Sequence, residues 1–330
     1  MKLKVTGLVL AGVAAVSLTL SAFAASTEET GFQPPMPPMV PPVVEVEETE
    51  PAEPASPFCL DGEPMETLVY QAQNNVYYIT VESFVTAMNS EAMVEQEDGV
   101  VTVTASSLAE VVDVENTNSY FTPFEPEEEA DEANVEEETL SLTAQNGAYY
   151  AVANGRYLYV EGGVKLVEDK VALPVRVLAE VFNLTVGYDS ETKTVQLAHQ
   201  EDASVYLESG DAYYDADALY WLSRIINAES GNQSLTGKIA VGNVVMNRVA
   251  SPKFPNTIYE VIFQKNQFSP AASGSIYRTP NEQSVIAAKL VLDGAEVLED
   301  VLFFNRAGMN TYAARTRTYV ATIGAHAFYA

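Results

Sequence analysis

The sequence predicts an α+β multidomain protein, with small strand–helix–strand repeats in its first two thirds and a mainly helical C-terminal domain. Three observations predict this organisation. Long acidic runs interrupt the chain, two segments with a shared apolar pattern lie 94 residues apart, and apolar spacing of the helical kind begins after residue 215. We therefore expect a signal peptide at 1–24, linkers at 25–57, 106–139 and 200–214, repeats at 58–105 and 140–199, and a final domain at 215–330.

The first 24 residues have the pattern of a secretory signal. A short basic start, Met1 to Lys4, is followed by an uncharged run from 5 to 20 and by small residues that end at Ala24. The alternative is an uncleaved membrane anchor, because the run approaches spanning length. The small-residue site favours cleavage and a secreted protein, and no later segment is apolar enough for stable membrane insertion.

The net charge of −29 is concentrated in the front of the chain. Residues 25–210 carry 36 acidic and 5 basic side chains, whereas residues 211–330 carry 10 of each. Residues 26–57 also contain nine prolines, which favours an extended or disordered spacer. Such an acidic front half repels nucleic acid and anionic membrane surfaces, so neither is an expected partner. The single cysteine, Cys59, excludes an internal disulfide framework.

The two similar segments run from Tyr78 to Thr104 and from Ala172 to Ala198. They align without gaps, and each predicts a strand, a short helix, a turn and a final alternating strand. The second copy resembles the small module named after the N-terminal domain of copper amine oxidases, and the first is a degenerate copy. The residues that carry this resemblance are Asn154-Gly155-Arg156, Leu173 to Glu180 and Asp189 to Leu197. The resemblance implies an accessory domain of an exported protein, acting as a spacer or in wall binding.

The C-terminal domain begins with a helix that ends near Glu229. Leu222, Ile225, Ile226 and Glu229 fall at i, i+3, i+4 and i+7, so the carboxylate extends an apolar stripe. A Glu near a helix end is more often a solvated surface residue. On an apolar face, however, lost solvation raises the pKa of a carboxyl, which then keeps the proton that a glycosidic oxygen needs.

Five further elements are expected in this domain. We expect a helix over 234–249 with small residues at 237, 240 and 242, and a short helix capped by Thr257. A capping box at 279–282 opens a helix that stops at Gly294, and short strands are expected at 302–305 and 319–323.

These residues resemble the catalytic domain of the spore-cortex-lytic enzyme SleB and related cell-wall hydrolases. The resemblance covers about 219–329 and rests on the segments 228–233, 237–248, 251–256, 267–269 and 322–329. Family members often carry a second Glu where Gln233 stands here. The family implies a lysozyme-like helical fold, wall association, and peptidoglycan glycan strands as substrate. We expect no cofactor and no metal, because the only two histidines, His199 and His326, lie in different expected domains.

The resemblance further implies lytic transglycosylase chemistry at the MurNAc–GlcNAc bond, with Glu229 as general acid and then general base. Simple muramidase hydrolysis and a catalytically inactive wall-binding protein remain as alternatives. The family positions suggest a sugar-binding wall at Gln267, Phe268 and Ser269. Arg248 is either a further substrate ligand or a structural hydrogen-bonding residue, and Arg315 is a candidate partner for substrate carboxylates, as is Arg317.

Overall fold

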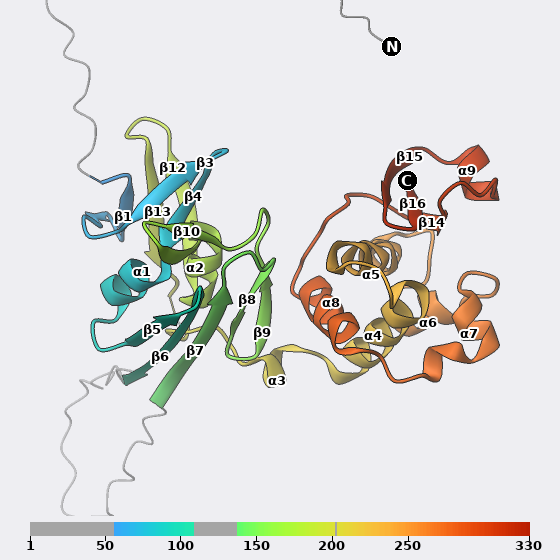
Figure 1. Cartoon of the computed structure of the whole chain (residues 1–330), viewed down its shortest axis with the longest axis horizontal. Coiled ribbons are helices and arrows are strands. Elements are labelled where there is room, and N and C mark those ends of the chain that lie inside the picture. The colour runs from blue at the N-terminus through green and yellow to red at the C-terminus, as the bar shows by residue number, and fades with distance from the viewer. Residues whose placement is uncertain (1–55, 109–136, 202) are drawn as a thin grey trace, which may run out of the picture. The chain divides into compact units, whose positions relative to one another are not determined.

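The computed structural model describes residues 56–108, 137–201 and 203–330 (Figure 1). The expected signal peptide at 1–24, almost all of the linker at 25–57 and most of the acidic linker at 106–139 lie outside these residues. Within the described residues, no helix has the length and hydropathy needed to cross a bilayer.

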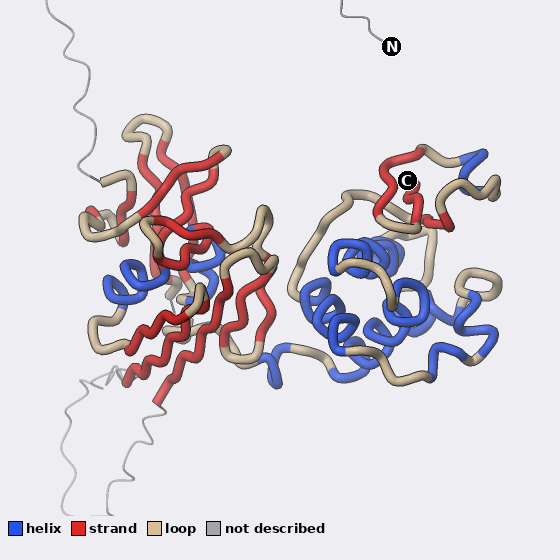
Figure 2. The backbone as a smooth tube through the Cα atoms, viewed as in Figure 1, coloured by secondary structure: helices blue, strands red, loops and turns tan. Residues whose placement is uncertain are grey.

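The part of the chain before residue 200 is built from strands with two short helices. The elements that the apolar pattern predicted in both copies are present, which confirms the repeat at this level (Figure 2). The first copy contains β1 (Phe58–Leu60), β2 (Glu63–Pro64), β3 (Tyr70–Gln73), β4 (Val76–Thr80), α1 (Val81–Met88), β5 (Met93–Glu97) and β6 (Val100–Leu108). The second contains β7 (Glu137–Gln145), β8 (Tyr150–Ala153), β9 (Arg156–Tyr159), β10 (Lys165–Val167), β11 (Lys170–Pro174), α2 (Val175–Val181), β12 (Leu184–Asp189) and β13 (Thr194–His199).

The two copies do not fold as separate domains, contrary to the expected division at 58–105 and 140–199. Strand β1 pairs in parallel with β13, β4 pairs antiparallel with β11, and β6 pairs antiparallel with β7. The resulting sheets have the orders β12-β13-β1-β2, β10-β11-β4-β3 and β5-β6-β7-β8-β9. A single apolar core takes fully buried residues from both copies, among them Phe58, Phe84, Leu142 and Leu178. The copies therefore form one strand-exchanged unit.

The segment 200–214 is also not a free linker. Tyr206 and Leu207 are buried in the strand-rich core, and the Leu207 amide donates to the carbonyl of Val181. The side chain of Asn183 donates to the carbonyls of Ser204 and Tyr206, which fixes this segment to the end of α2. The short helix α3 (Gly210–Tyr213) then leads into the helical part of the chain.

The part of the chain after residue 215 is mainly helical, as expected. Its helices are α4 (Ala216–Ser230), α5 (Leu235–Ala250), α6 (Ile258–Phe263), α7 (Ser269–Ser273), α8 (Glu282–Leu292) and α9 (Tyr312–Thr316), with a 3₁₀ turn, η1 (Ser275–Tyr277). Asp215, Ser234 and Thr257 cap α4, α5 and α6 by accepting backbone N–H groups through their side chains.

The expected capping box at 279–282 is displaced by two residues. Asn281, not Thr279, is the N-cap of α8, and its side chain accepts the amide of Ser284. Pro280 therefore lies before the helix and not at its first position. The helix still ends where predicted, because Gly294 follows Asp293 with a φ of +93°.

The core of the helical part lies where α4, α5 and α8 meet. Leu222, Ile225 and Ile226 on α4 are fully buried, and so are Val244 and Val245 on α5. Gly242 allows the close approach that its small size predicted. A Cβ at this position would lie 2.8 Å from Val291 Cγ2 on α8 and 3.0 Å from Ile226 Cδ1 on α4.

Gly242→Val should therefore destabilise the helical part strongly. The added methyl groups have no space between α4 and α8, and overpacking a rigid core costs about 1–3 kcal/mol. Ala250→Val is the matched control, because Ala250 is exposed on the same helix and reports only the cost of a β-branched residue. Urea denaturation of both variants measures the difference, and equal loss in the two would contradict the close contact.

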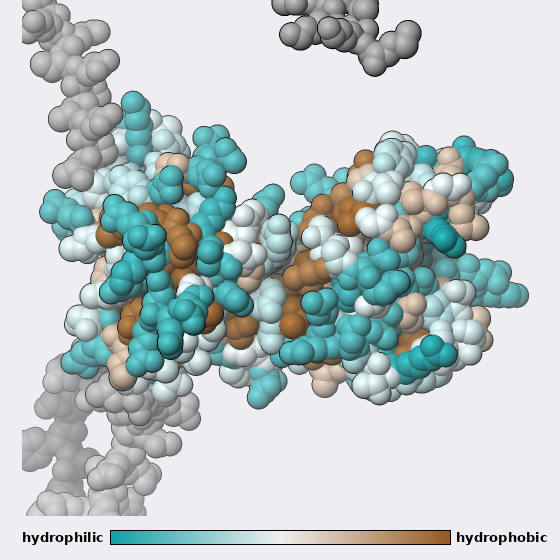
Figure 3. All heavy atoms as spheres, viewed as in Figure 1, coloured by the Kyte–Doolittle hydropathy of each residue, from teal (hydrophilic) through white to brown (hydrophobic). Residues whose placement is uncertain are grey.

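A small antiparallel sheet completes the helical part, in the order β14-β16-β15. Strands β14 (Phe303–Arg306) and β15 (Tyr319–Ile323) were expected, whereas β16 (His326–Tyr329) was not. The pattern of β16 gave no alternation, because Ala327, Phe328 and Tyr329 are all buried in a row. The sheet lies along α5 (Figure 1). On the face drawn in Figure 3, hydrophilic side chains cover most of the surface, with apolar residues exposed between them.

Candidate active site

Glu229 lies in the last turn of α4, and the apolar stripe that precedes it is buried as predicted. Leu222, Ile225 and Ile226 have no exposed surface, while Glu229 is partly buried. Burial raises the pKa of the Glu229 carboxyl above its ordinary value of 4.5, and no other cause contributes. Among the described residues, no ion pair or hydrogen bond engages this carboxylate.

The electrostatics of Glu229 therefore differ from those of a solvated surface residue. A neighbouring carboxylate would raise the pKa through repulsion, and a neighbouring cation would lower it, but desolvation acts alone here. A carboxylic acid in this setting retains its proton to higher pH and delivers it without breaking a salt bridge.

The end of α4 is held in place by hydrogen bonds to the start of α8. The side-chain carbonyl of Asn227 accepts the backbone amide of Asn281 at 3.1 Å and the hydroxyl of Ser284 at 3.4 Å. The side-chain amide of Asn281 donates to the carbonyl of Gly231 at 3.0 Å. Because these bonds lie on both sides of Glu229 in the sequence, they limit the movement of the turn that carries it.

Gln233 ties the loop after α4 to the turn between β15 and β16. Its Oε1 accepts the amide of Ala325 at 2.9 Å, and its backbone carbonyl accepts the Nζ of buried Lys238 at 2.6 Å. Gly324 makes this contact possible, since it has a φ of +56° and any Cβ there would collide with Gln233 Oε1. The geometry gives Gln233 a positioning role that needs only a hydrogen-bond acceptor.

Two substitutions test whether position 233 needs a charge. Gln233→Glu keeps the acceptor and should leave activity within about threefold of wild type, while Gln233→Ala removes the bond and should cost about 1 kcal/mol of stability. Urea denaturation and release of soluble fragments from purified cell wall measure the two effects. A large gain in activity for Gln233→Glu would instead indicate that the second Glu of the family is a catalytic group.

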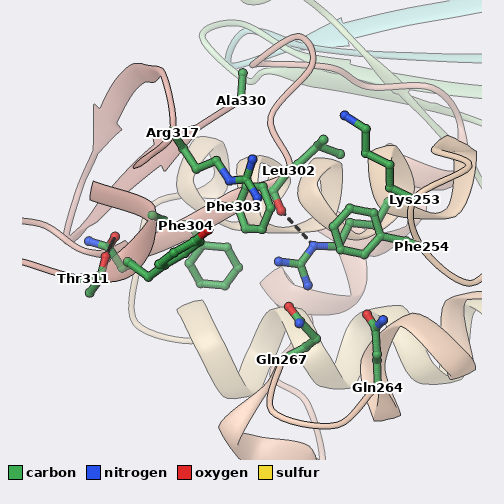
Figure 4. Close-up of a pocket in the computed structure, with 14 residues that line it drawn as sticks. Lys253, Phe254, Gln264, Gln267, Leu302, Phe303, Phe304, Thr311, Arg317 and Ala330 are labelled. Atoms are coloured by element: carbon green, nitrogen blue, oxygen red, sulfur yellow. Dashed lines mark hydrogen bonds between the residues drawn. The ribbon is translucent and has the colours of Figure 1, made fainter. Parts of the chain in front are cut away.

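A cavity of ≈ 750 Å³ lies in the helical part (Figure 4). Glu229 is not among the residues that line it. Its wall is cationic, amide-bearing and aromatic, and contains no Asp or Glu. The lining residues are Arg248, Lys253, Phe254, Gln264, Gln267, Leu302, Phe303, Phe304, Asn305, Thr311, Tyr312, Ala313, Arg317 and Ala330. They come from the end of α5, the segment around α6, strand β14 and the region of α9.

Arg248 is the buried cation of this cavity. Only 4% of its surface is exposed, and its Nε donates to the carbonyl of Leu302 at 2.8 Å. The guanidinium lies within 4.9 to 5.4 Å of the ring centres of Phe254, Phe268 and Phe303. Burial lowers the pKa of Arg248 to about 10, and its Nη1 is buried without a hydrogen-bond partner.

The structure brings together only some of the residues expected to contact substrate. Gln267 lines the cavity with Arg248, and Phe268 is buried beneath the Arg248 guanidinium. Ser269 is exposed at the start of α7 and does not line the cavity. Arg315 is exposed on α9, where its Nη1 donates to the carbonyl of Asn310.

The sequence alone did not place two cations, Arg317 and Lys253, in the wall of this cavity. Arg315 lies in the last turn of α9, whereas Arg317 follows that helix in extended conformation, and Arg317, not Arg315, lines the cavity. Its guanidinium lies 4.6 Å from the ring centre of Phe303. Lys253 was missed, and the signal that could have found it is its place beside Phe254, which packs against Arg248.

Trp221 lies in a cluster of aromatic rings. It packs at right angles or nearly so against Tyr220, Tyr259, Phe263 and Tyr277, at 4.9 to 6.1 Å between ring centres. This aromatic cluster joins α4 to α6 and η1. Its tyrosines are 41% to 60% exposed and remain open to a planar ligand.

Potential metal ligands do not converge within the described residues. No group of three or more His, Cys, Asp and Glu side chains is placed there to hold a metal ion. His326 is half-buried beside Phe304, with 5.2 Å between the ring centres, and burial lowers its pKa.

Comparison with known families defines two domains in this chain. Residues 232–329 match the family model described as cell wall hydrolase, and residues 123–197 match the copper amine oxidase N-terminal domain. Both resemblances inferred from the sequence are thereby confirmed. The cell wall hydrolase match begins three residues after Glu229, so it does not itself include that residue.

Particular relatives match the same part of the chain. A spore cortex-lytic enzyme from Bacillus cereus is 33% identical over 116 residues, covering 35% of this chain and 45% of that protein. The spore cortex-lytic enzyme from Bacillus subtilis is 32% identical over 108 residues, covering 32% and 35%. The chain thus spans less than half the length of these relatives.

A solved structure also matches this part. The catalytic domain of the germination-specific lytic transglycosylase SleB from Bacillus anthracis is 30% identical, with a TM-score of 0.34, and the match covers 38% of this chain and all of that one. The catalytic domain of the Bacillus cereus SleB protein is 31% identical, with the same TM-score, and covers 36% and 92%.

Proposed function

We propose that this chain is a cell-wall enzyme that cleaves peptidoglycan glycan strands between N-acetylmuramic acid and N-acetylglucosamine. In this proposal the protein is exported by the signal at 1–24, and its helical part is a lysozyme-like catalytic domain. The observation that carries the proposal is Glu229, a partly buried carboxyl whose pKa is raised by burial alone at the end of an apolar stripe. The cell wall hydrolase match and the similarity to spore cortex-lytic enzymes support the substrate class.

The proposed reaction is a lytic transglycosylation. Protonated Glu229 donates its proton to the glycosidic oxygen, which leaves with the N-acetylglucosamine residue as the bond to muramoyl C1 breaks. The muramoyl C6 hydroxyl then attacks C1, and the Glu229 carboxylate accepts the hydroxyl proton. The product is a 1,6-anhydro sugar, the enzyme regains its proton, and no water enters the reaction.

A single-carboxylate route agrees with the surroundings of Glu229. Hydrolytic schemes use a second carboxylate about 5 to 9.5 Å away, and a charge at that distance would act on the Glu229 pKa. Desolvation is the only influence on this pKa among the described residues, which supports the route without a partner. As candidate partners, Glu260 and Glu282 lie in the first turns of two other helices, α6 and α8.

Analysis of the released muropeptides by mass spectrometry tests the proposal. Incubation of the purified protein with peptidoglycan should give 1,6-anhydromuramoyl ends, which are 18 mass units lighter than reducing ends because one water is not added. Reducing ends alone would establish muramidase hydrolysis in place of transglycosylation. The absence of any release would favour a wall-binding protein without catalytic activity.

A further inference from the structure

Three cationic side chains and no acidic side chain line the ≈ 750 Å³ cavity. Arg248, Lys253 and Arg317 line it, no acidic residue does, and none of these three forms an ion pair within the described residues. A buried guanidinium without an anionic partner is costly, because its desolvation is not repaid by a salt bridge.

Two buried polar atoms in the same wall have no partner. Nη1 of Arg248 is a donor and Oε1 of Gln264 is an acceptor, and both are buried without a hydrogen bond. Arg248 itself is 96% buried, and Figure 4 shows Gln264 and Gln267 pointing from the α6 side toward the Leu302 carbonyl that accepts Arg248 Nε. Buried polar groups in native proteins are normally paired, so an unpaired donor and acceptor together indicate a missing ligand.

The chemistry of these groups selects the ligand. The planar guanidinium fork matches a carboxylate, and the exposed side chains of Lys253 and Arg317 add further positive charge. An amide oxygen such as Gln264 Oε1 needs a hydrogen-bond donor, which the backbone N–H groups of a peptide supply. The rings of Phe254, Phe303 and Phe304 offer apolar surface for short side chains. A short peptide with free carboxylates satisfies all of these groups.

We propose that this cavity is a peptide-carboxylate subsite, which binds the stem peptide of peptidoglycan through Arg248, Arg317 and Lys253. This inference rests on the proposed function for its choice of substrate. The subsite does not include the place of cleavage, because Glu229 is not among the residues that line the cavity.

Direct binding measurements test this assignment on the full chain, by isothermal titration calorimetry. The probe is a synthetic stem pentapeptide with free carboxylates, and the comparison is the same peptide with every carboxylate amidated. We expect the free acid to bind at least about tenfold more tightly, since hydrogen bonds to an ionised carboxylate are stronger than those to a neutral amide. Equal binding of the two peptides, or no detectable binding of either, would overturn the proposal.

Matched variants locate the binding to the cavity. Arg317→Ala and Lys253→Ala change exposed side chains and should each weaken binding of the free-acid peptide about threefold to tenfold. Arg306→Ala and Lys265→Ala remove exposed charges outside the lining and should leave binding unchanged. Arg248→Met retains the volume between the three phenylalanine rings without the charge, and should abolish binding. Equal losses in the cavity and control variants would place the binding elsewhere.

Two further probes separate the sources of the anion. N-Acetylmuramic acid carries a free lactyl carboxylate on the sugar, and inorganic phosphate carries charge without an N–H donor. Tighter binding of N-acetylmuramic acid than of the peptide, or equal competition by phosphate, would overturn the assignment to a peptide. Cleavage of peptide-free glycan strands is measured separately, so loss of peptide binding with intact cleavage refutes the subsite alone, and binding without cleavage refutes the proposed enzyme alone.

Discussion

Glu229→Gln should abolish glycan cleavage, with a loss of at least about 10²-fold in the rate of muropeptide release. The amide keeps the size and polarity of the side chain but carries no proton that can be transferred to a leaving oxygen. General acid–base catalysis contributes about 10² to 10⁴ to a rate, and here one group performs both the acid and the base step. Release of soluble muropeptides from purified peptidoglycan, followed over time, measures the loss.

The matched controls replace other acids of the helical part. Glu296→Gln changes an exposed carboxylate and should keep full activity. Glu260→Gln and Glu282→Gln test the two acids considered as partners, and both should also remain active. A loss in either of these that equals the loss in Glu229→Gln would indicate a two-carboxylate mechanism and contradict the single-acid account.

The Glu229→Gln variant should also be more stable than the wild type at neutral pH. The folded-state pKa of Glu229 is raised above its unfolded value of 4.5, so the unfolded chain loses this proton first as the pH increases. Below pH 4.5 the carboxyl is neutral in both states and the two proteins should be equally stable. Between 4.5 and the raised folded pKa the wild type loses stability relative to the variant, and the deficit persists above that range. Thermal unfolding from pH 4 to 8 measures this difference, which a wet surface carboxylate would not produce.

The second large effect concerns the strand-rich part of the chain. A fragment of residues 137–208 contains the whole second repeat, yet it should not fold on its own. It lacks β1, β4 and β6, so β13, β11 and β7 would each present an unpaired edge. It would also expose the faces of the core that cover Phe58, Val81 and Phe84. Exposing apolar surface to water costs about 25 cal/mol of folding free energy for each Å².

Circular dichroism and amide exchange of this fragment measure the outcome. We expect no cooperative thermal transition for residues 137–208 alone, and recovery of one when a fragment of residues 56–108 is added. The fragment 56–208 is the control and should unfold cooperatively. A stable, cooperatively unfolding 137–208 fragment would contradict the strand-exchanged core.

The sequence pattern was sufficient for the elements of the two repeats but not for how they combine. Alternation in 100–104 and 194–198 predicts strands, because successive side chains lie on opposite faces of a sheet. Which strand lies beside β4 depends on pairing across 90 residues, and a period of two residues contains no information about the partner. The pairing of β4 with β11 could therefore not be predicted from the sequence, and the two copies were predicted to fold as separate domains.

The candidate site was likewise predictable from the sequence only in part. The spacing of Leu222, Ile225, Ile226 and Glu229 was sufficient to place the carboxyl on a buried stripe, because helix geometry fixes that face locally. The cavity could not be predicted in the same way. It joins the end of α5 to β14 and α9, and a loop alone does not determine whether Arg315 or Arg317 faces inward. Arg248 was left open between two roles, and it combines a structural bond to Leu302 with an unpaired nitrogen.

A direct titration of the Glu229 side chain in the folded protein tests the central claim most closely. Carbon-13 NMR of protein labelled at the glutamate carboxyl carbon, with Glu229→Gln for assignment, follows this one group across the pH range. A midpoint clearly above 4.5 would agree with an unpaired acid that burial keeps protonated. A midpoint at or below 4.5 would show a solvated or ion-paired carboxylate, and the proposed proton donor would then have to be another residue.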